Sequence, residues 1–182
     1  MRVHRLVFTL IAASVSTESL SAQAGGLSIG GGVVIPASQY SSHDHAGWHV
    51  LIGYTPVGSP SSSLALRVDG LFGQTTRKTG FTGSVPSSKV FGLGLNLELH
   101  TNARAAVMPY LLAGTGYYEL EEGNLNGTTA SPESGIAVIG GLGLAVRLGG
   151  ARGFVEGRLI AGPGSNGISF VPVTVGVSIG GW

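Results

Sequence analysis

The sequence predicts an all-β protein, an eight-stranded antiparallel up-and-down transmembrane β-barrel. Eight segments show a two-residue period in which large apolar residues alternate with Gly, Ala or charged residues, as in strands with one apolar face. Only 10% of the residues are charged and 43% are hydrophobic, whereas a soluble domain carries about a quarter charged residues. The connections between the segments alternate between short and long, as they do in barrels of outer membranes.

Residues 1–24 have the features of a secretory signal peptide. Two arginines precede an apolar run over 6–15, and a small-x-small site, Ala-Gln-Ala, ends the segment. The run is too short for a membrane-spanning helix, and every later apolar stretch is interrupted by Gly, Ser, Thr or a charge. We therefore expect export and a mature outer-membrane β-barrel domain over 25–182, with a formal net charge that falls from +1 to 0 when the leader is removed.

The strands are predicted where the two-residue period is sustained, and most approach the roughly nine to eleven residues that a tilted strand needs to cross a bilayer. In chain order they are 27–35, 48–55, 64–73, 90–99, 108–118, 136–148, 154–162 and 170–179. The first two and the fifth are assigned on this period and on their spacing as hairpins. In 64–73, the even-numbered leucine and valine residues share one face, and the other face carries Arg67 and Asp69.

The remaining strands repeat this division between a large apolar face and a small or polar one. In 90–99, every odd position from 93 is Leu, and the opposite face carries glycines and Glu98. In 136–148, leucines and a valine oppose glycines and Arg147, and in 154–162 the face opposite the apolar one holds Glu156 and Arg158. In 170–179, every odd position from 171 is Val or Ile, and the even positions after Phe170 are Pro, Thr, Gly and Ser.

The connections distinguish the two ends of the predicted barrel. Those after the second, fourth and sixth strands are compact, and those after the first, third and fifth are longer and more polar. Short turns at one end and long loops at the other are typical of outer-membrane barrels, whose turns face the periplasm. The last connection, 163–169, is short for an outer loop.

The small face is predicted to line the lumen. A soluble lipocalin-type barrel shows the same alternation, but it would then expose mainly Gly, Ala and a few charges to water. Glycines inside an eight-stranded barrel give inward arginines and glutamates room, and burial of those charges requires that they pair. We predict a lumen salt-bridge network, with a catalytic carboxylate pair as the alternative, of Arg67, Asp69, Glu98, Arg147, Glu156 and Arg158.

The aromatic residues gather near the predicted strand ends, while Leu, Val, Ile and Ala fill the strand centres. Amphipathic rings are most favourable at the level of the lipid headgroups. We therefore predict an interfacial aromatic girdle of Trp48, Tyr54, Phe72, Phe91, Tyr110, Tyr117, Tyr118, Phe154, Phe170 and Trp182.

With these features, the chain resembles the small outer-membrane β-barrel family of the OmpA and OmpX type. The matching pieces are the leader, the segment 109–118 and the closing segment 170–177 with a terminal aromatic. The resemblance implies export, insertion by the outer-membrane assembly machinery and both termini in the periplasm. One departure is that Gly180 and Gly181 put Trp182 out of phase with the apolar residues before it, which a bulge at the glycines would restore.

The sequence offers little for catalysis or metal binding. The chain has no Cys, so thiol chemistry and thiolate metal sites are excluded. His43, Asp44 and His45, followed by His49, form one metal-like group, but adjacent spacing on a loop fixes no geometry. Ser42 beside His43 has no identifiable orienting partner for a hydrolase. We predict no catalytic residue, no metal and no cofactor.

Charged outer loops are the remaining functional hint. The second long loop carries Arg77, Lys78 and Lys89, and the third carries four glutamates, at 119, 121, 122 and 133. These charges either pair with each other or form a binding surface. We expect an envelope-structural or surface-binding role through the extracellular loops; the alternatives are a narrow solute channel and, with less support, a lipid-modifying enzyme.

The expected partners are those of the outer membrane. They are membrane lipid, lipopolysaccharide and the assembly machinery, and the charge balance gives no indication of nucleic-acid binding. We expect a monomer in the bacterial outer membrane.

Overall fold

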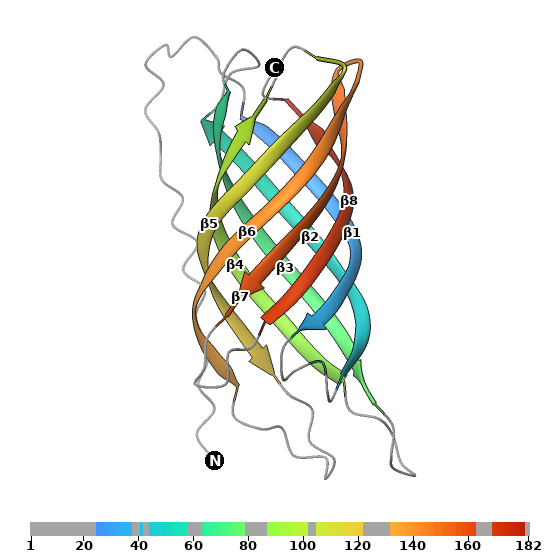
Figure 1. Ribbon diagram of the computed structural model, residues 1–182, viewed down its shortest axis with the longest axis vertical. Helices are drawn as coiled ribbons and strands as arrows, with labels where there is room; N and C mark the ends of the chain where they lie inside the picture. The colour runs from blue at the N-terminus through green and yellow to red at the C-terminus, as the bar shows by residue number, and fades with distance from the viewer. Residues whose placement is uncertain are drawn as a thin grey trace.

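The computed structural model is a closed barrel of eight antiparallel strands (Figure 1). It describes residues 25–37, 41, 44–57, 63–78, 87–101, 105–121, 132–162 and 169–180. The strands are β1 (Gly26–Ala37), β2 (Asp44–Val57), β3 (Leu64–Arg77), β4 (Ser87–His100), β5 (Val107–Glu121), β6 (Glu133–Leu148), β7 (Ala151–Ala161) and β8 (Ser169–Ile179).

Each strand pairs with its neighbours in sequence, and β1 pairs with β8 to close the barrel. This order confirms the predicted fold class. At one end, here called the turn end, the β6–β7 hairpin closes through Gly149 and Gly150, and Gly149 has a φ of 64° that favours glycine. The opposite end, here called the loop end, holds the connections β1–β2, β3–β4, β5–β6 and β7–β8.

All eight predicted strands are present, but several extend further at the loop end. β2 begins at Asp44 and β3 ends at Arg77, and these two residues are paired in the ladder. Leu120 on β5 likewise pairs with Glu133 on β6. The predicted bounds stopped where the apolar alternation stopped, whereas backbone hydrogen bonding continues into the polar residues beyond it. The ladder therefore continues past the apolar band toward the solvent.

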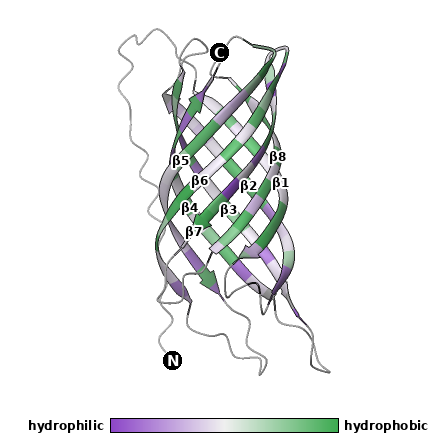
Figure 2. Ribbon diagram, in the orientation of Figure 1, coloured by the Kyte–Doolittle hydropathy of each residue, from purple (hydrophilic) through white to green (hydrophobic). Residues whose placement is uncertain are grey.

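The outer wall carries the apolar face of every strand. Leu93, Leu95, Leu97 and Leu99 of β4 are all exposed, and the residues between them are buried. On β8, Val175 is 61% exposed and the neighbouring Thr174 is fully buried. Hydrophobic and neutral colours dominate the barrel wall in Figure 2, with hydrophilic colour mainly at the strand ends and at a few positions within the wall. A continuous wall of exposed Leu, Val and Ile is suited to hydrocarbon, so the predicted orientation of the two faces is confirmed.

In the part of the chain that the structure describes, no helix is long and apolar enough to span a bilayer.

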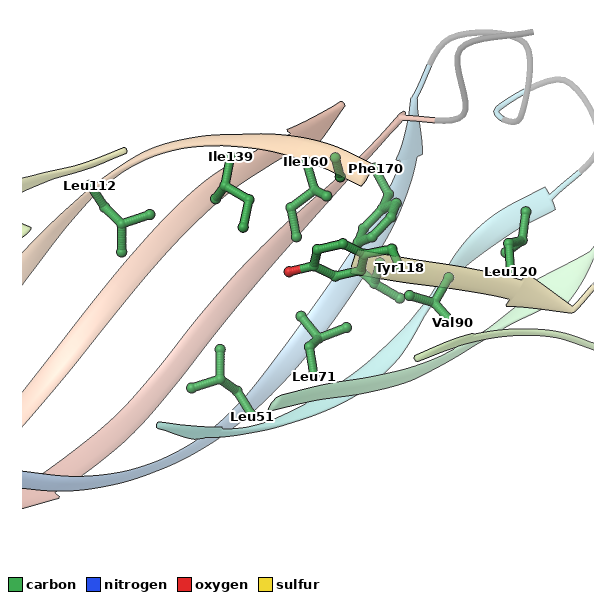
Figure 3. Close-up of a cluster of buried hydrophobic side chains, with 11 residues drawn as sticks. Leu51, Leu71, Val90, Leu112, Tyr118, Leu120, Ile139, Ile160 and Phe170 are labelled. Atoms are coloured by element: carbon green, nitrogen blue, oxygen red, sulfur yellow. The ribbon is translucent and has the colours of Figure 1, made fainter. Parts of the chain in front are cut away.

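The buried apolar side chains form two clusters inside the lumen. The larger one fills the half nearer the loop end and contains Val34, Leu51, Leu71, Val90, Leu112, Tyr118, Leu120, Ala137, Ile139, Ile160 and Phe170 (Figure 3). The smaller one, at the turn end, contains Met108, Tyr110, Ala145 and Phe154. Charged residues lie between them. The lumen is therefore the core of the protein.

The orientation of the wall predicts a depth-dependent effect of charge. Leu95→Arg puts an arginine on the outer wall near the middle of β4 and should lower the free energy of unfolding by about 2 to 4 kcal/mol. Leu99→Arg, on the same face one residue from the end of β4, should cost about 0 to 1 kcal/mol. Urea unfolding of both variants in liposomes measures the difference. Equal stability of Leu95→Arg and the wild type would reverse the assignment of the faces.

Candidate functional site

A cluster of five buried charged residues occupies the middle of the lumen. Arg67 and Asp69 come from β3, Glu98 from β4, and Glu156 and Arg158 from β7, and each is at most 1% exposed. Because residues two apart on a strand share a face, the pairs 67/69 and 156/158 both point inward. In a ring of eight strands, β3 and β7 lie opposite each other. Contacts between these two pairs therefore span the bore.

Ion pairs connect the five charges into one network. Arg67 contacts Asp69 with Nε at 2.9 Å from Oδ1, and its Nη2 lies 2.8 Å from Oε2 of Glu156 across the lumen. Arg158 contacts Oδ2 of Asp69 at 2.7 Å through Nη1. Arg67 also pairs with Glu98, and Arg158 with Glu156. Each arginine thus holds a carboxylate on its own strand and one on the opposite side.

A tyrosine, an asparagine, a histidine and a further arginine complete the network. Tyr110 donates its hydroxyl to Glu156 at 2.8 Å, and the side-chain amide of Asn96 donates to Asp69 at 2.7 Å. Nε2 of His100 lies 3.2 Å from Glu98, and Nη2 of Arg152 lies 4.0 Å from the same carboxylate. The contacts of Tyr110, Asn96 and His100 give the carboxylates further hydrogen-bond partners, which burial of a charge requires.

Arg147, the sixth residue of the hypothesised network, is not a member of this buried cluster. It occupies an inward position on β6, but it is exposed, next to the turn at Gly149 and Gly150 where the lumen opens. Its ladder partner Arg152 is only 14% exposed and is the arginine that approaches Glu98. The two-residue period correctly places Arg147 on the inward face of its strand, but it could not show how far along the bore the residue lies. The prediction that Arg147 belongs to the buried network is therefore wrong.

The aromatic girdle is only partly as predicted. Trp48, Tyr54, Phe72, Phe91 and Tyr117 are exposed on the outer wall, all on β2 to β5, and the rings of Trp48 and Phe72 are 5.6 Å apart. Trp182 lies outside the described residues. The other four are at most 5% exposed and point into the lumen, so the prediction is wrong for Tyr110, Tyr118, Phe154 and Phe170.

Three of the four inward rings each lie opposite a glycine on the neighbouring strand. In the ladder, Tyr118 pairs with Gly92, Tyr110 with Gly143, and Phe154 with Gly176. A Cβ added to any of these glycines would overlap the ring of its partner. The glycines therefore make room for rings as well as for the charged side chains that the sequence suggested. The inward position of each ring could have been predicted from the face it occupies in the two-residue period of its own strand. Its distance from the strand end carried no such information.

The metal-like group of the sequence is spread over different environments. Asp44 is buried and accepts a hydrogen bond of 2.6 Å from the hydroxyl of Thr75. His49 is buried in the lumen, 2.8 Å from the hydroxyl of Thr174 on β8, whereas His45 is exposed. Ser42 and His43 lie outside the described residues. Among the residues that the structure describes, no group of three or more His, Asp or Glu side chains could hold a metal ion.

The loop charges are described in part. Lys78 donates to the backbone carbonyl of Ser41 at 2.7 Å, and Lys89 lies 4.0 Å from Glu121. Glu119 and Glu133 are exposed at the loop end. The side chain of Arg77, and Glu122 as a whole, fall outside the described part of the chain.

The network predicts a large difference between two arginine substitutions. Arg67→Met leaves three carboxylates without their shared cation in the lumen, and loss of one partner of a buried ion pair costs about 3 to 5 kcal/mol. Arg147→Met changes an exposed side chain and should alter stability by no more than about 0.5 kcal/mol. Urea midpoints of the refolded variants in liposomes test this. Similar losses for both would place Arg147 in the network after all.

The pairing of rings with glycines predicts a second contrast. Gly92→Ala pushes a methyl group into the Tyr118 ring and should destabilise the barrel by about 1 to 3 kcal/mol through overpacking. Gly140→Ala is the matched control, because it lies on the outer wall of β6 and a Cβ there meets nothing within 4 Å. Thermal unfolding followed by the shift in gel mobility compares the two. Equal melting temperatures would show that the lumen has spare room at Tyr118.

No protein-family model and no curated protein matches the chain, but several solved structures share its fold. Neisserial surface protein A is 15% identical with a TM-score of 0.64, covering 86% of this chain and 96% of that one. The outer membrane protein OprG from Pseudomonas aeruginosa is 13% identical with a TM-score of 0.58, covering 85% and 95%. Ail, the attachment invasion locus protein of Yersinia pestis, is 16% identical with a TM-score of 0.56, covering 85% and 96%.

At these identities the similarity shows a shared fold and nothing more. That fold is consistent with the apolar outer wall and the filled lumen described above. An apolar outer wall around a polar and aromatic core requires a surrounding bilayer, and these barrels are built for the bacterial outer membrane. The chain therefore has the fold of small eight-stranded outer-membrane β-barrels, the fold that the resemblance to the OmpA and OmpX type implied.

Proposed function

We propose that the protein is a closed, non-conducting barrel that acts through its surface at the loop end, in an envelope-structural or surface-binding role. The observation that carries this proposal is the filling of the lumen in three layers. Apolar side chains occupy the loop-end half, the charged cluster occupies the middle, and Tyr110 and Phe154 with their neighbours occupy the turn end. A solute crossing the barrel would have to displace all three.

The outermost layer contains the largest apolar side chains. Tyr118 and Phe170 come from β5 and β8, and their rings meet edge to face with centroids 5.6 Å apart. Leu71, Ile139 and Ile160 are each at most 1% exposed in the same cluster. Figure 3 shows these side chains converging from strands on different sides of the barrel. Such a layer excludes water and ions.

The middle layer is closed by charge pairing. An eight-stranded barrel is only wide enough for its own side chains. An ion at this level would compete with contacts of 2.7 to 2.9 Å that already neutralise the arginines and carboxylates. Opening the path would expose these charges without partners, at a cost of several kcal/mol for each ion.

The enzyme hypothesis has less support from the geometry. Asp44 and His49 are buried and hydrogen-bonded to Thr75 and Thr174, while His45 is exposed. A base and its orienting partner must lie within hydrogen-bond reach of each other, and these three residues do not form such a pair in the described contacts. The names of two structural neighbours, a surface protein and an attachment protein, agree with a surface role.

The proposal predicts a silent barrel in planar bilayers. Refolded protein that migrates differently when boiled and unboiled should give no discrete current steps, because each lumen layer alone blocks the bore. Tyr118→Ala combined with Phe170→Ala should also stay silent, since the charged layer remains intact.

A porin added at the end of each recording shows that the bilayer can report a channel. Discrete, reproducible steps from the wild-type barrel would overturn the proposal and favour the narrow solute channel.

A further inference from the structure

The backbone ladder between β7 and β8 is interrupted at Pro172. The ladder pairs Gly157 with Val173 and next Ile160 with Phe170, and the two pairs expected between them are missing. Both missing pairs require a hydrogen bond donated by the backbone nitrogen of residue 172, and proline has no N–H. A backbone carbonyl of β7 is therefore left without its ladder donor at this level.

This interruption differs from a β-bulge. In the β2–β3 ladder, the register shifts where β2 has extra residues. In the β7–β8 ladder, the register is the same on both sides of the gap, so a donor is missing and no residue is inserted. Leu159 and Val173, which flank the gap on the outer wall, are exposed apolar residues. The gap therefore faces hydrocarbon, where no water can replace the missing donor.

The two strands are held together weakly between the gap and the loop end. There the described ladder joins β7 to β8 by two pairs, Ile160 with Phe170 and Ala161 with Ser169. The side chains of Ile160 and Phe170 belong to the larger apolar cluster of the lumen (Figure 3). If the strands part, these side chains meet hydrocarbon instead of water. The hydrophobic effect then opposes the separation very little, because lipid tails are as apolar as the side chains.

Side-chain contacts tie the strands on both sides of the gap to β2 and β3. Arg158 on β7 donates from Nη1 to Oδ2 of Asp69 on β3 at 2.7 Å. On β8, the hydroxyl of Thr174 lies 2.8 Å from Nε2 of His49 on β2. All four side chains are buried, and β2 and β3 pair with each other. The two strands that do not bond at the gap are thus held from inside by the same part of the wall.

We propose that the barrel wall opens between β7 and β8 at the loop end, and that these two side-chain contacts hold it closed. The seam consists of residues 158–161 on β7 and 169–172 on β8. Its opening leads sideways into the membrane and lies on the loop-end side of the charged layer. The inference therefore goes beyond the proposed surface role, because it concerns the wall and not the loops.

The test is hydrogen exchange of single amides, followed by NMR on the refolded full chain in nanodiscs. Along a strand, backbone hydrogen bonds alternate between the two neighbouring strands, so the amide of Ile160 bonds to β8 and that of Leu159 bonds to β6. The comparison therefore lies within one strand. Protection of Ile160 should be about tenfold lower than that of Leu159, because opening of the seam breaks only the bond to β8.

A proline substitution tests the cause of the weakness. Pro172→Ala supplies the missing donor and should raise the protection of Ile160 about fivefold, the effect of one hydrogen bond. Pro109→Ala is the matched control, because Pro109 also lies within a strand but its ladder with β6 has no gap. The control should leave the protection of Ile160 unchanged.

A second substitution tests the contacts that hold the seam closed. Thr174→Val removes the hydroxyl that contacts His49 and should lower the protection of Ile160 about fivefold, with Leu159 unchanged. Equal protection of Ile160 and Leu159 in the wild type, or no change in Pro172→Ala, would overturn the inference. So would an equal loss at both amides in Thr174→Val, since the contact would then support the whole barrel.

A disulfide provides a measurement that does not depend on weakening the barrel. The chain has no cysteine, so Leu159→Cys combined with Val171→Cys places a single disulfide across the seam. Oxidation should raise the protection of Ile160 and reduction should reverse the change; the same protection in both states would contradict an opening seam. The bilayer recordings judge the proposed function separately, because current reports the bore and exchange reports the wall.

Discussion

The paired charges across the bore are the constraint on which the rest of the barrel depends. Arg67 and Asp69 of β3 face Glu156 and Arg158 of β7 from opposite sides of the ring, so each contact between them ties two strands that share no backbone hydrogen bond. A shift of either strand by one residue would turn its charges toward lipid. The network therefore stabilises the register of the whole barrel, and the wall must keep the spacing that the ion pairs need.

The spacing that the ion pairs require leaves little room in the lumen for aromatic rings. Glycines on the neighbouring strands provide that room. Gly92, Gly143 and Gly176 face Tyr118, Tyr110 and Phe154 on neighbouring strands, where any Cβ would overlap a ring. Tyr110 shows why the arrangement is coupled, because its ring needs Gly143 and its hydroxyl donates to Glu156. Packing of the turn end and pairing of the charged layer are thus parts of one arrangement.

The period of the sequence was enough to predict the strands and the face of each residue, because a two-residue alternation maps directly onto a barrel with one side in lipid. It could not predict depth along the bore or position around it. Arg147 lies on the predicted face but at the open turn end, and Arg152 approaches Glu98 in its place. The inward aromatics were misassigned because their distance from the strand ends was considered without their face.

Where the protein can interact follows from what its interior already satisfies. In the lumen, the arginines and carboxylates hold each other at contact distance, and removal of a partner would leave buried charge. At the rim, Lys89 and Glu121 are 4.0 Å apart, with side chains that are 50% and 38% exposed. Such surface pairs contribute only about 0 to 1 kcal/mol to stability. Exchanging the contact at the rim therefore costs little, while exchanging a contact in the lumen costs several kcal/mol. The charges in the lumen are thus held by one another, and the pair at the rim is a contact that can be exchanged at little cost.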